Sequence, residues 1–312
     1  MNRTRLLLLA AALLPLGGCK WLDEKLGKIT DPKEGGPLKP ARAEQFVSYV
    51  NERAGRLQSI QYDQASMTVS APNMVLSPTL RGWLAAGQPR KFNMVAEGAV
   101  AGKVILGSND EQFWVYVNAP REKPVYVYAS HTDFAAGHAK IPGIPFEPDW
   151  VMQALGMATL PEKNEYKVDV DQKARTYTLS WPATLPSGGP VVKEIVFDGD
   201  AATGTRPQVK RHVIRDPKGK VICFADVKQV KTAEVLQNDP RTGQQVKLPV
   251  QYPTRVVLKW EEQKFEMDLQ LNGAQVNKPF TEAELRQNFT RPNIPDATPH
   301  NLAEYREPIP KQ

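Results

Sequence analysis

The stretch Lys264–Leu271, with the sequence KFEMDLQL, decides the fold class. In it Phe265, Met267, Leu269 and Leu271 alternate with charged or polar residues. Successive side chains of a β-strand point to opposite faces, so this period of two predicts a strand with one buried and one solvated face. We therefore expect a sheet that covers a core on one side and meets water on the other.

The same alternation recurs along the chain. Tyr166–Val170 and Tyr177–Trp181 are two such strands, joined by a turn at 171–174. The other candidates are 65–71, 79–86, 90–97, 103–108, 111–118, 124–130, 192–198, 207–215, 220–230 and 254–262. Their close spacing is typical of hairpins. We predict a mainly β fold: a single large antiparallel curved sheet, an incomplete half-barrel of about eleven strands.

An amphipathic helix is predicted before the first strand. Residues 41–57 (ARAEQFVSYVNERAGRL) place Phe46 and Val50 on one apolar stripe at helical spacing, with charged residues mostly on the other side. We expect this helix to pack on the sheet.

A second helix is predicted in mid-chain, at Pro148–Ala158 (PDWVMQALGMA), where Trp150, Val151 and Leu155 share one side. Two helices are too few to cover both faces of a large sheet, so we expect both on the concave face. Short helices depend on packing for their stability. The mid-chain helix is therefore predicted to be a movable lid.

The N-terminus has the pattern of a signal peptide. Arg3 and Arg5 precede the apolar stretch Leu6–Leu14, and small residues follow. A membrane-spanning helix needs ~20 apolar residues, about twice this length. The stretch is therefore predicted to be removed rather than to anchor the mature protein.

The residues Leu16-Gly17-Gly18-Cys19 resemble the lipobox of bacterial lipoproteins. The resemblance implies cleavage before Cys19 and attachment of diacylglycerol and a further acyl chain, of the palmitate type, to that residue. Each buried CH₂ contributes ~0.8 kcal/mol, so several chains together anchor firmly. Lys20 stands where Asp tends to mark inner-membrane retention, which implies an outer-membrane anchor facing the periplasm.

Four segments follow from these patterns. They are a signal peptide at 1–18, the lipidated Cys with a flexible tether at 19–40, a folded domain at 41–290 and a Pro-rich C-terminal tail at 291–312. Removing residues 1–18 leaves 38 basic and 34 acidic residues, a net charge of +4. The basic residues are scattered, so nucleic acid is not an expected partner, whereas a membrane surface is.

The sequence offers no recognisable catalytic or cofactor motif. Cys223 lies in a strand-like run and has no second Cys for an internal disulfide. His131, His138 and Asp133 could hold a metal in principle. Their spacing fits no usual ligand pattern, and we favour a solvated loop there. We expect no enzyme activity, no metal and no cofactor.

The order of elements, a helix, about six strands, a mid-chain helix and more strands, resembles the LolA/LolB-like superfamily of lipoprotein carriers. Gly82–Asn93 and Gly102–Val117 carry the likeness in the first half. Leu248-Pro249, Val256–Trp260 and Val276-Asn277 carry it near the end. The resemblance implies a half-barrel lidded by helices that binds acyl chains of lipoproteins or lipid. The segment 231–251 is predicted to be a hairpin or loop excursion that has no counterpart in these carriers.

Aromatic residues gather on two predicted neighbouring strands: Phe113, Trp114, Tyr116, Tyr126 and Tyr128. Large side chains then point to both faces, so one face is expected to pack against a lid or a ligand.

Together with Phe46, Val50, Trp150, Val151 and Leu155, these aromatic residues are our candidates for the cavity and its lid. Two alternatives remain at this point. The helices could fill the whole space as an ordinary core, or the fold could serve as an envelope scaffold that binds no ligand.

Overall fold

The computed structural model describes residues 36–304 except for 73, 75, 100–101, 121, 140–147, 186–188, 201–207 and 239–242. The signal peptide, Cys19 and most of the tether lie outside the described residues. None of the helices in the described part is long and apolar enough to cross a membrane.

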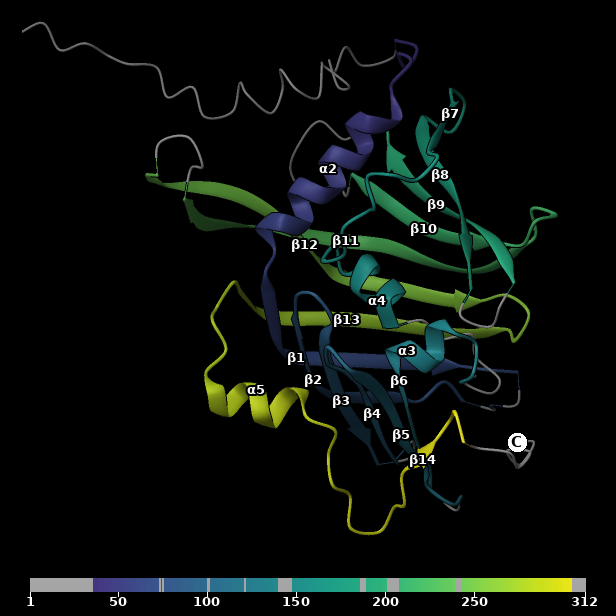
Figure 1. Cartoon of the computed structure of the whole chain (residues 1–312), viewed down its shortest axis with the longest axis vertical. Helices are drawn as coiled ribbons and strands as arrows, with labels where there is room; N and C mark the ends of the chain where they lie inside the picture. Colours follow the sequence, from purple (N-terminus) through teal and green to yellow (C-terminus); the bar gives the residue numbers. More distant parts are fainter. Residues whose placement is uncertain are drawn as a thin grey trace, which may run out of the picture.

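One open sheet of 14 strands forms the body of the molecule (Figure 1). The strands are β1 (Ser59–Ser70), β2 (Thr79–Gly87), β3 (Lys91–Gly98), β4 (Gly102–Ser108), β5 (Gln112–Asn118), β6 (Val125–Ser130), β7 (Lys167–Asp171), β8 (Thr176–Thr184), β9 (Pro190–Asp198), β10 (Val209–Arg215), β11 (Val221–Asn238), β12 (Gln245–Trp260), β13 (Phe265–Val276) and β14 (His300–Asn301). The described helices are α2 (Ala43–Arg56), α3 (His131–Ala135), α4 (Pro148–Ala154) and α5 (Glu282–Phe289). The mainly β fold is confirmed, but the expected number of strands is too low.

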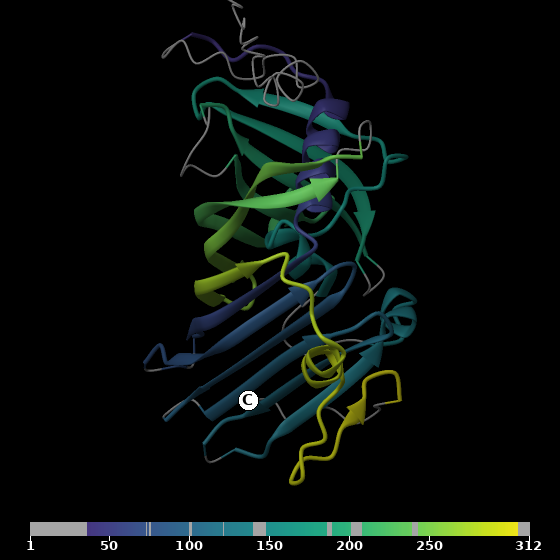
Figure 2. The same ribbon diagram turned by 90° about the vertical axis from the view of Figure 1, so that its left-hand side faces the viewer.

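The sheet consists of two antiparallel runs joined at its centre. Its order is β14-β6-β5-β4-β3-β2-β1-β13-β12-β11-β10-β9-β8-β7. β1 pairs with β13 over a long register that runs from Ile60 opposite Val276 to Ser70 opposite Glu266. Figure 2 shows the two runs on either side of this central pair.

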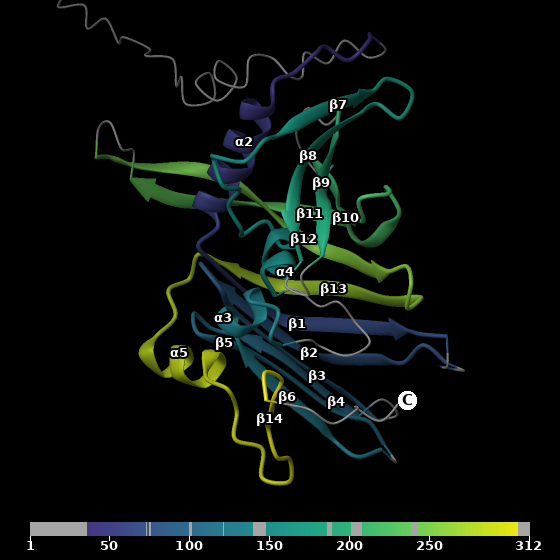
Figure 3. The same cartoon turned by 45° about the vertical axis from the view of Figure 1, so that its right-hand side comes forward.

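In antiparallel runs, alternate turns lie at the same end of the sheet. The turns β1–β2, β3–β4, β5–β6 and β12–β13 therefore share one end, which we call the tip end. The β1–β2 hairpin projects there, at the right of Figure 3. The long hairpin of β11 and β12, which we call the arm, projects at the opposite end. It accounts for segment 231–251, since Thr232 pairs with Gln251 and Asn238 with Gln245.

α2, α3 and α4 lie within the curve of the sheet (Figure 3). α4 is shorter than the predicted Pro148–Ala158 helix. Gly156, with φ of +79°, adopts the left-handed conformation that terminates a helix, and the Met157 N–H donates to the carbonyl of Met152 at 2.9 Å. The strand pattern of Lys264–Leu271 is confirmed, since Leu269 and Leu271 are buried and Gln270 is exposed.

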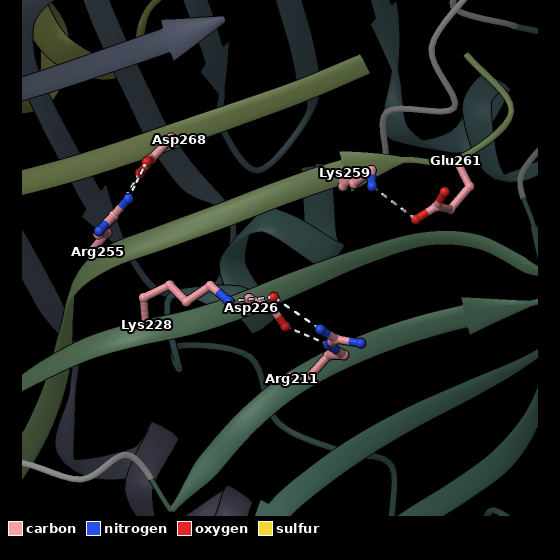
Figure 4. A network of polar contacts seen from close by, with 7 residues as sticks. All are labelled: Arg211, Asp226, Lys228, Arg255, Lys259, Glu261 and Asp268. Atoms are coloured by element: carbon pink, nitrogen blue, oxygen red, sulfur yellow. Dashed lines mark hydrogen bonds and ion pairs between the residues drawn. The ribbon is translucent and has the colours of Figure 1, made fainter. Parts of the chain in front are cut away.

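The outer face of the central strands is polar and carries ion pairs (Figure 4). Asp226 accepts hydrogen bonds from Arg211 and Lys228, and Arg255 pairs with Asp268 at 2.6 Å. Burial alone would raise the pKa of Asp226, but the bonds from Arg211 and Lys228 outweigh it and hold that pKa below its usual value. The ion pairs therefore keep a buried carboxylate charged on the outer face.

The Pro-rich tail packs on the sheet as far as residue 304. β14 pairs in parallel with the edge strand β6, and Leu302 is buried. The Tyr126 hydroxyl donates to the Pro292 carbonyl, and the Arg291 guanidinium lies 3.7 Å above the Tyr128 ring. The segment therefore covers part of the outer face and the edge of the sheet.

Candidate functional site

The inner face of the curved sheet carries a set of partly buried apolar side chains, which we call the concave apolar face. They pack against the main core around α4: Val104, Val115, Ile222, Phe265 and Met267. Val104, Ile222 and Phe265 stand at the beginning of β4, β11 and β13, which start at the tip end. Apolar surface therefore continues outward from the core toward the tip end, as it also does at the opposite end around Leu248 and Val276.

Three aromatic rings mark the inner limit of this face. Trp150 of α4 lies edge to face on Trp260, with ring centroids 5.9 Å apart. Trp260 in turn contacts Phe265 at 5.5 Å. Both tryptophans are 1% exposed, and the Trp150 Nε1–H has no acceptor among the described residues. The rings form a hydrophobic wall that carries one unused donor.

α4 is embedded rather than laid over the surface. All its residues except Asp149 are buried, and so are Leu155 and Met157 after it. A cover over an open cavity would keep one face toward solvent. In this structure α4 is thus part of the core and forms the inner wall of the concave apolar face.

The predicted residues do not all meet at this face. Trp150, Val151 and Leu155 belong to the main core. Phe46 and Val50 of α2 pack in a separate cluster over β8 and β9, where the Phe46 ring lies 4.7 Å from that of Phe197. The expectation that the two helices share one space is therefore wrong for these residues.

The aromatic set on β5 and β6 is divided between the two faces. Phe113 packs on the inner side against Phe134 of α3, with centroids 4.9 Å apart. Trp114, Tyr116 and Tyr126 pack on the outer side, with Tyr128, under Ile294 and Ala297 of the C-terminal segment. Those outer-side residues face away from α4, so chain packing and not a ligand explains their burial.

A pocket of about 190 Å³ lies between α3, α4 and the β2–β3 turn. Arg90 closes one side through a two-pronged ion pair with Asp149, its Nε and Nη2 lying 3.0 and 2.9 Å from the two carboxylate oxygens. Phe134, Pro148 and Leu185 supply apolar walls. The ion pair ties the start of α4 to the sheet at the end opposite the tips.

His131 also lines this pocket but is held by protein contacts. Its Nε2 lies 2.8 Å from the Asn109 carbonyl and 3.2 Å from Ser108 Oγ. Burial lowers its pKa below the usual value, and the hydrogen bond to Asn109 opposes this shift. The stretch we expected to be a solvated loop forms α3, capped by Ser130 Oγ accepting from the Asp133 N–H. Across the described residues no group of three His, Cys, Asp or Glu could hold a metal ion.

A buried polar cluster lies between α2 and the sheet. His212 of β10 is 4% exposed, and its Nδ1 has no partner among the described residues. Burial lowers the pKa of His212 to about 3, and the nearby positive charge of Arg53 adds to the shift. Arg53 reaches Gln251, its Nε lying 3.4 Å from the carbonyl oxygen. His212 is therefore neutral at physiological pH.

A second pocket, of about 320 Å³, lies where β1 bulges between Tyr62 and Ala65. Its lining is polar, with Asp63, Gln64, Ser66, Arg81 and Asn272. None of the five residues that define the concave apolar face lines it.

Sequence reasoning missed several residues of the site. Trp260 and Val104 lie in segments that carry the family resemblance, but neither they nor Ile222 were assigned to the site, because their role depends on which strands become neighbours. Phe265 and Met267 were predicted to be buried, and their alternation was the signal that could have placed them on the inner face.

The solved structures that are similar to this chain include the following two. One is a domain from Vibrio parahaemolyticus described as outer membrane lipoprotein-sorting, with 12% identity and a TM-score of 0.44 over 79% of this chain and 98% of that one. The other is a DUF1329 family protein from Desulfovibrio piger, with 12% identity and a TM-score of 0.42 over 76% and 95%. No protein-family model and no curated protein matches the sequence. At 12% sequence identity the likeness to these structures does not transfer any activity to this chain.

Proposed function

We propose that this chain is a lipid-anchored lipoprotein of the bacterial cell envelope that binds an apolar ligand, acyl chains of lipoproteins or of lipid, without catalysis. The ligand lies against the concave apolar face. The observation that carries this proposal is the row of partly exposed apolar side chains, Val104, Val115, Ile222, Phe265 and Met267, that continues the core toward the tip end.

The chemistry of this face suits acyl chains. Its side chains are aliphatic or aromatic, and ligand sites are mostly apolar with few polar groups. The Trp150 Nε1–H, which lacks an acceptor among the described residues, supplies one polar group at the inner wall. An acyl chain lying along the face would meet Phe265 and Met267 first and the Trp150–Trp260 pair last.

The membrane half of the proposal rests on the N-terminal sequence. The lipobox-like residues Leu16–Cys19 supply the anchor, and residues 20–40 could reach ~70 Å when fully extended. A protein so tethered stays within reach of the lipid that it would bind. Lys20 favours the periplasmic face of the outer membrane.

Lipid binding is tested on the polypeptide from Lys20 onward, which keeps every described residue. Its lipid extract is analysed by mass spectrometry, and uptake of a fluorescent fatty acid is titrated. Met267→Lys places a charge on the concave apolar face, and Gln270→Lys places the same charge on the outer face of the same strand. We expect Met267→Lys to weaken uptake at least ~10-fold and Gln270→Lys to leave it unchanged, since burying one apolar side chain is worth ~1.5–3 kcal/mol.

Both variants should melt within a few degrees of the parent. Absence of lipid in the extract together with no fatty-acid uptake by the parent chain would refute the proposal. Equal uptake by the two variants would show that the ligand binds elsewhere.

The second candidate is an envelope scaffold, favoured by the arm. Leu236 on the arm is 63% exposed and is one of three large apolar side chains that are exposed in the described part of the chain. A scaffold would lose a specific envelope partner on Leu236→Asp and would show no fatty-acid uptake. Uptake that survives Leu236→Asp favours the carrier.

A further inference from the structure

The hairpin tip between β1 and β2 exposes apolar side chains in its described part, residues 71–72, 74 and 76–78. Three large apolar side chains are exposed in the described part of the chain, and two of them are here: Met74 at 46% and Leu76 at 75%. The hairpin itself is well formed, with Thr68 Oγ1 and Thr79 Oγ1 2.9 Å apart and Ser70 Oγ and Ser77 Oγ 2.7 Å apart below the tip. The exposed side chains are therefore presented on a supported hairpin.

The part of the hairpin that carries this tip is itself uncharged, although Glu266 of β13 stands opposite Ser70 near its base. Residues 64–80, seventeen in a row, contain no Asp, Glu, Lys or Arg, although 24% of the chain is charged. The β3–β4 turn at 98–102, at the same end of the sheet, is also uncharged. Charged residues stand at the flanks of this end, with Glu261 and Lys264 in the β12–β13 turn and Lys123 before β6.

We infer that the β1–β2 tip inserts into the interfacial region of a lipid bilayer. A protein partner is disfavoured because two side chains fall far short of the ~800 Å² per partner that a stable protein interface buries. Binding to a bilayer needs less buried area, since a few apolar side chains can lie at the boundary of headgroups and acyl chains. Uncharged residues cross the headgroup layer at low cost, and the flanking charges stop deeper insertion.

The inference extends the proposed function by naming where the bilayer is met. The concave apolar face opens toward the tip end, where β4, β11 and β13 begin. With the tip inserted, the bilayer lies beside the partly exposed Phe265 and Val104. An acyl chain could then pass between bilayer and protein without crossing bulk water.

The test measures binding of the polypeptide from Lys20 onward to vesicles of phosphatidylethanolamine and phosphatidylcholine by sedimentation, at low and high salt. Leu76→Asp and Met74→Asp are compared with Leu236→Asp, which adds the same charge at an exposed leucine on the arm. We expect each tip variant to weaken binding at least ~10-fold and Leu236→Asp to leave it unchanged, because a charged side chain is costly to insert. Binding should change little with salt, since the tip carries no charge.

A probe on the tip gives a second readout. An environment-sensitive dye is attached to Leu76→Cys or, as control, to Leu236→Cys; Cys223 is buried and should not react. Vesicles should shift the emission of the first dye to the blue and leave the second unchanged. Equal vesicle binding by tip and arm variants, or dyes that respond alike, would overturn the inference.

Failure of this inference and failure of the proposed function are distinguishable. Fatty-acid uptake in solution does not involve the tip, so it should be the same in Leu76→Asp as in the parent chain. Fatty-acid uptake without tip-dependent vesicle binding would refute insertion of the tip and leave the proposed carrier function standing. Tip-dependent vesicle binding without fatty-acid uptake would refute the carrier function and leave insertion of the tip standing.

Discussion

Trp150 of α4 and Trp260 of β12 pack edge to face at the inner wall of the concave apolar face, with their ring planes at 74°. Because both rings are almost fully enclosed, replacing Trp150 with Ala should lower the free energy of unfolding by ~3–5 kcal/mol. Denaturant unfolding measures the loss. Trp83→Ala, at a half-buried position on β2, should cost less. A loss below ~1 kcal/mol together with reduced lipid content would instead show that α4 opens as a lid.

Gly156 and Gly55 form a matched pair for backbone strain. Gly156 has φ of +79°, and a Cβ there would lie 3.2 Å from the Arg53 guanidinium, whereas a Cβ on Gly55 would meet nothing within 4 Å. Gly156→Ala should destabilise the protein by ~1–3 kcal/mol. Gly55→Ala, near the end of α2, should stabilise it by up to ~1 kcal/mol. Thermal unfolding of both variants checks the contrast, and equal changes would contradict it.

The Arg90–Asp149 ion pair should contribute little to stability. Its side chains are 42% and 48% exposed, so solvent screens their attraction. A double-mutant cycle with Arg90→Ala and Asp149→Ala should give a coupling of ~0.2–1 kcal/mol. The coupling should shrink at high salt. A coupling above ~2 kcal/mol would mean that the pair is far better shielded than its exposure indicates.

His212 should make the protein sensitive to mild acid. Its folded pKa of about 3 lies below the ordinary 6.5, so between these values the unfolded chain binds more protons and stability falls as pH falls. From pH 6.5 to 4.5 this group alone should remove ~2 kcal/mol. His212→Leu should flatten the pH dependence by about that amount, whatever its stability at neutral pH. Unfolding in denaturant at several pH values measures it, and parallel profiles would count against the assignment.

The strands were predictable because their information is local. The alternation of Phe265 to Leu271 follows directly from which face of one strand meets the core, and the structure buries Leu269 and Leu271 accordingly. The stripe of Phe46 and Val50 likewise predicted that α2 would bury one side. Such patterns depend on the spacing of apolar residues, and this spacing is visible within a single segment of the sequence.

The predictions that failed concern residues whose burial depends on packing partners far away in the chain. Trp114 and Tyr126 are large and apolar, but nothing near them in sequence shows that Ile294 covers them. The arm agrees with the hairpin or loop excursion predicted at 231–251, but Leu236 has no pattern that distinguishes it from a core leucine. α4 ends earlier than predicted because Gly156 adopts a left-handed conformation and does not continue the helix.

The pairing of β1 with β13 at the centre of the sheet sets an order of folding. Ile60 and Val276 stand 216 positions apart, so closing that loop costs more entropy than forming any neighbouring hairpin. The meander β1 to β6 consists of local contacts and can form early, whereas the two halves join only once β13 is present. A chain still emerging from a ribosome or a translocon would thus lack its central seam, and sheet completion must follow release of nearly the whole polypeptide.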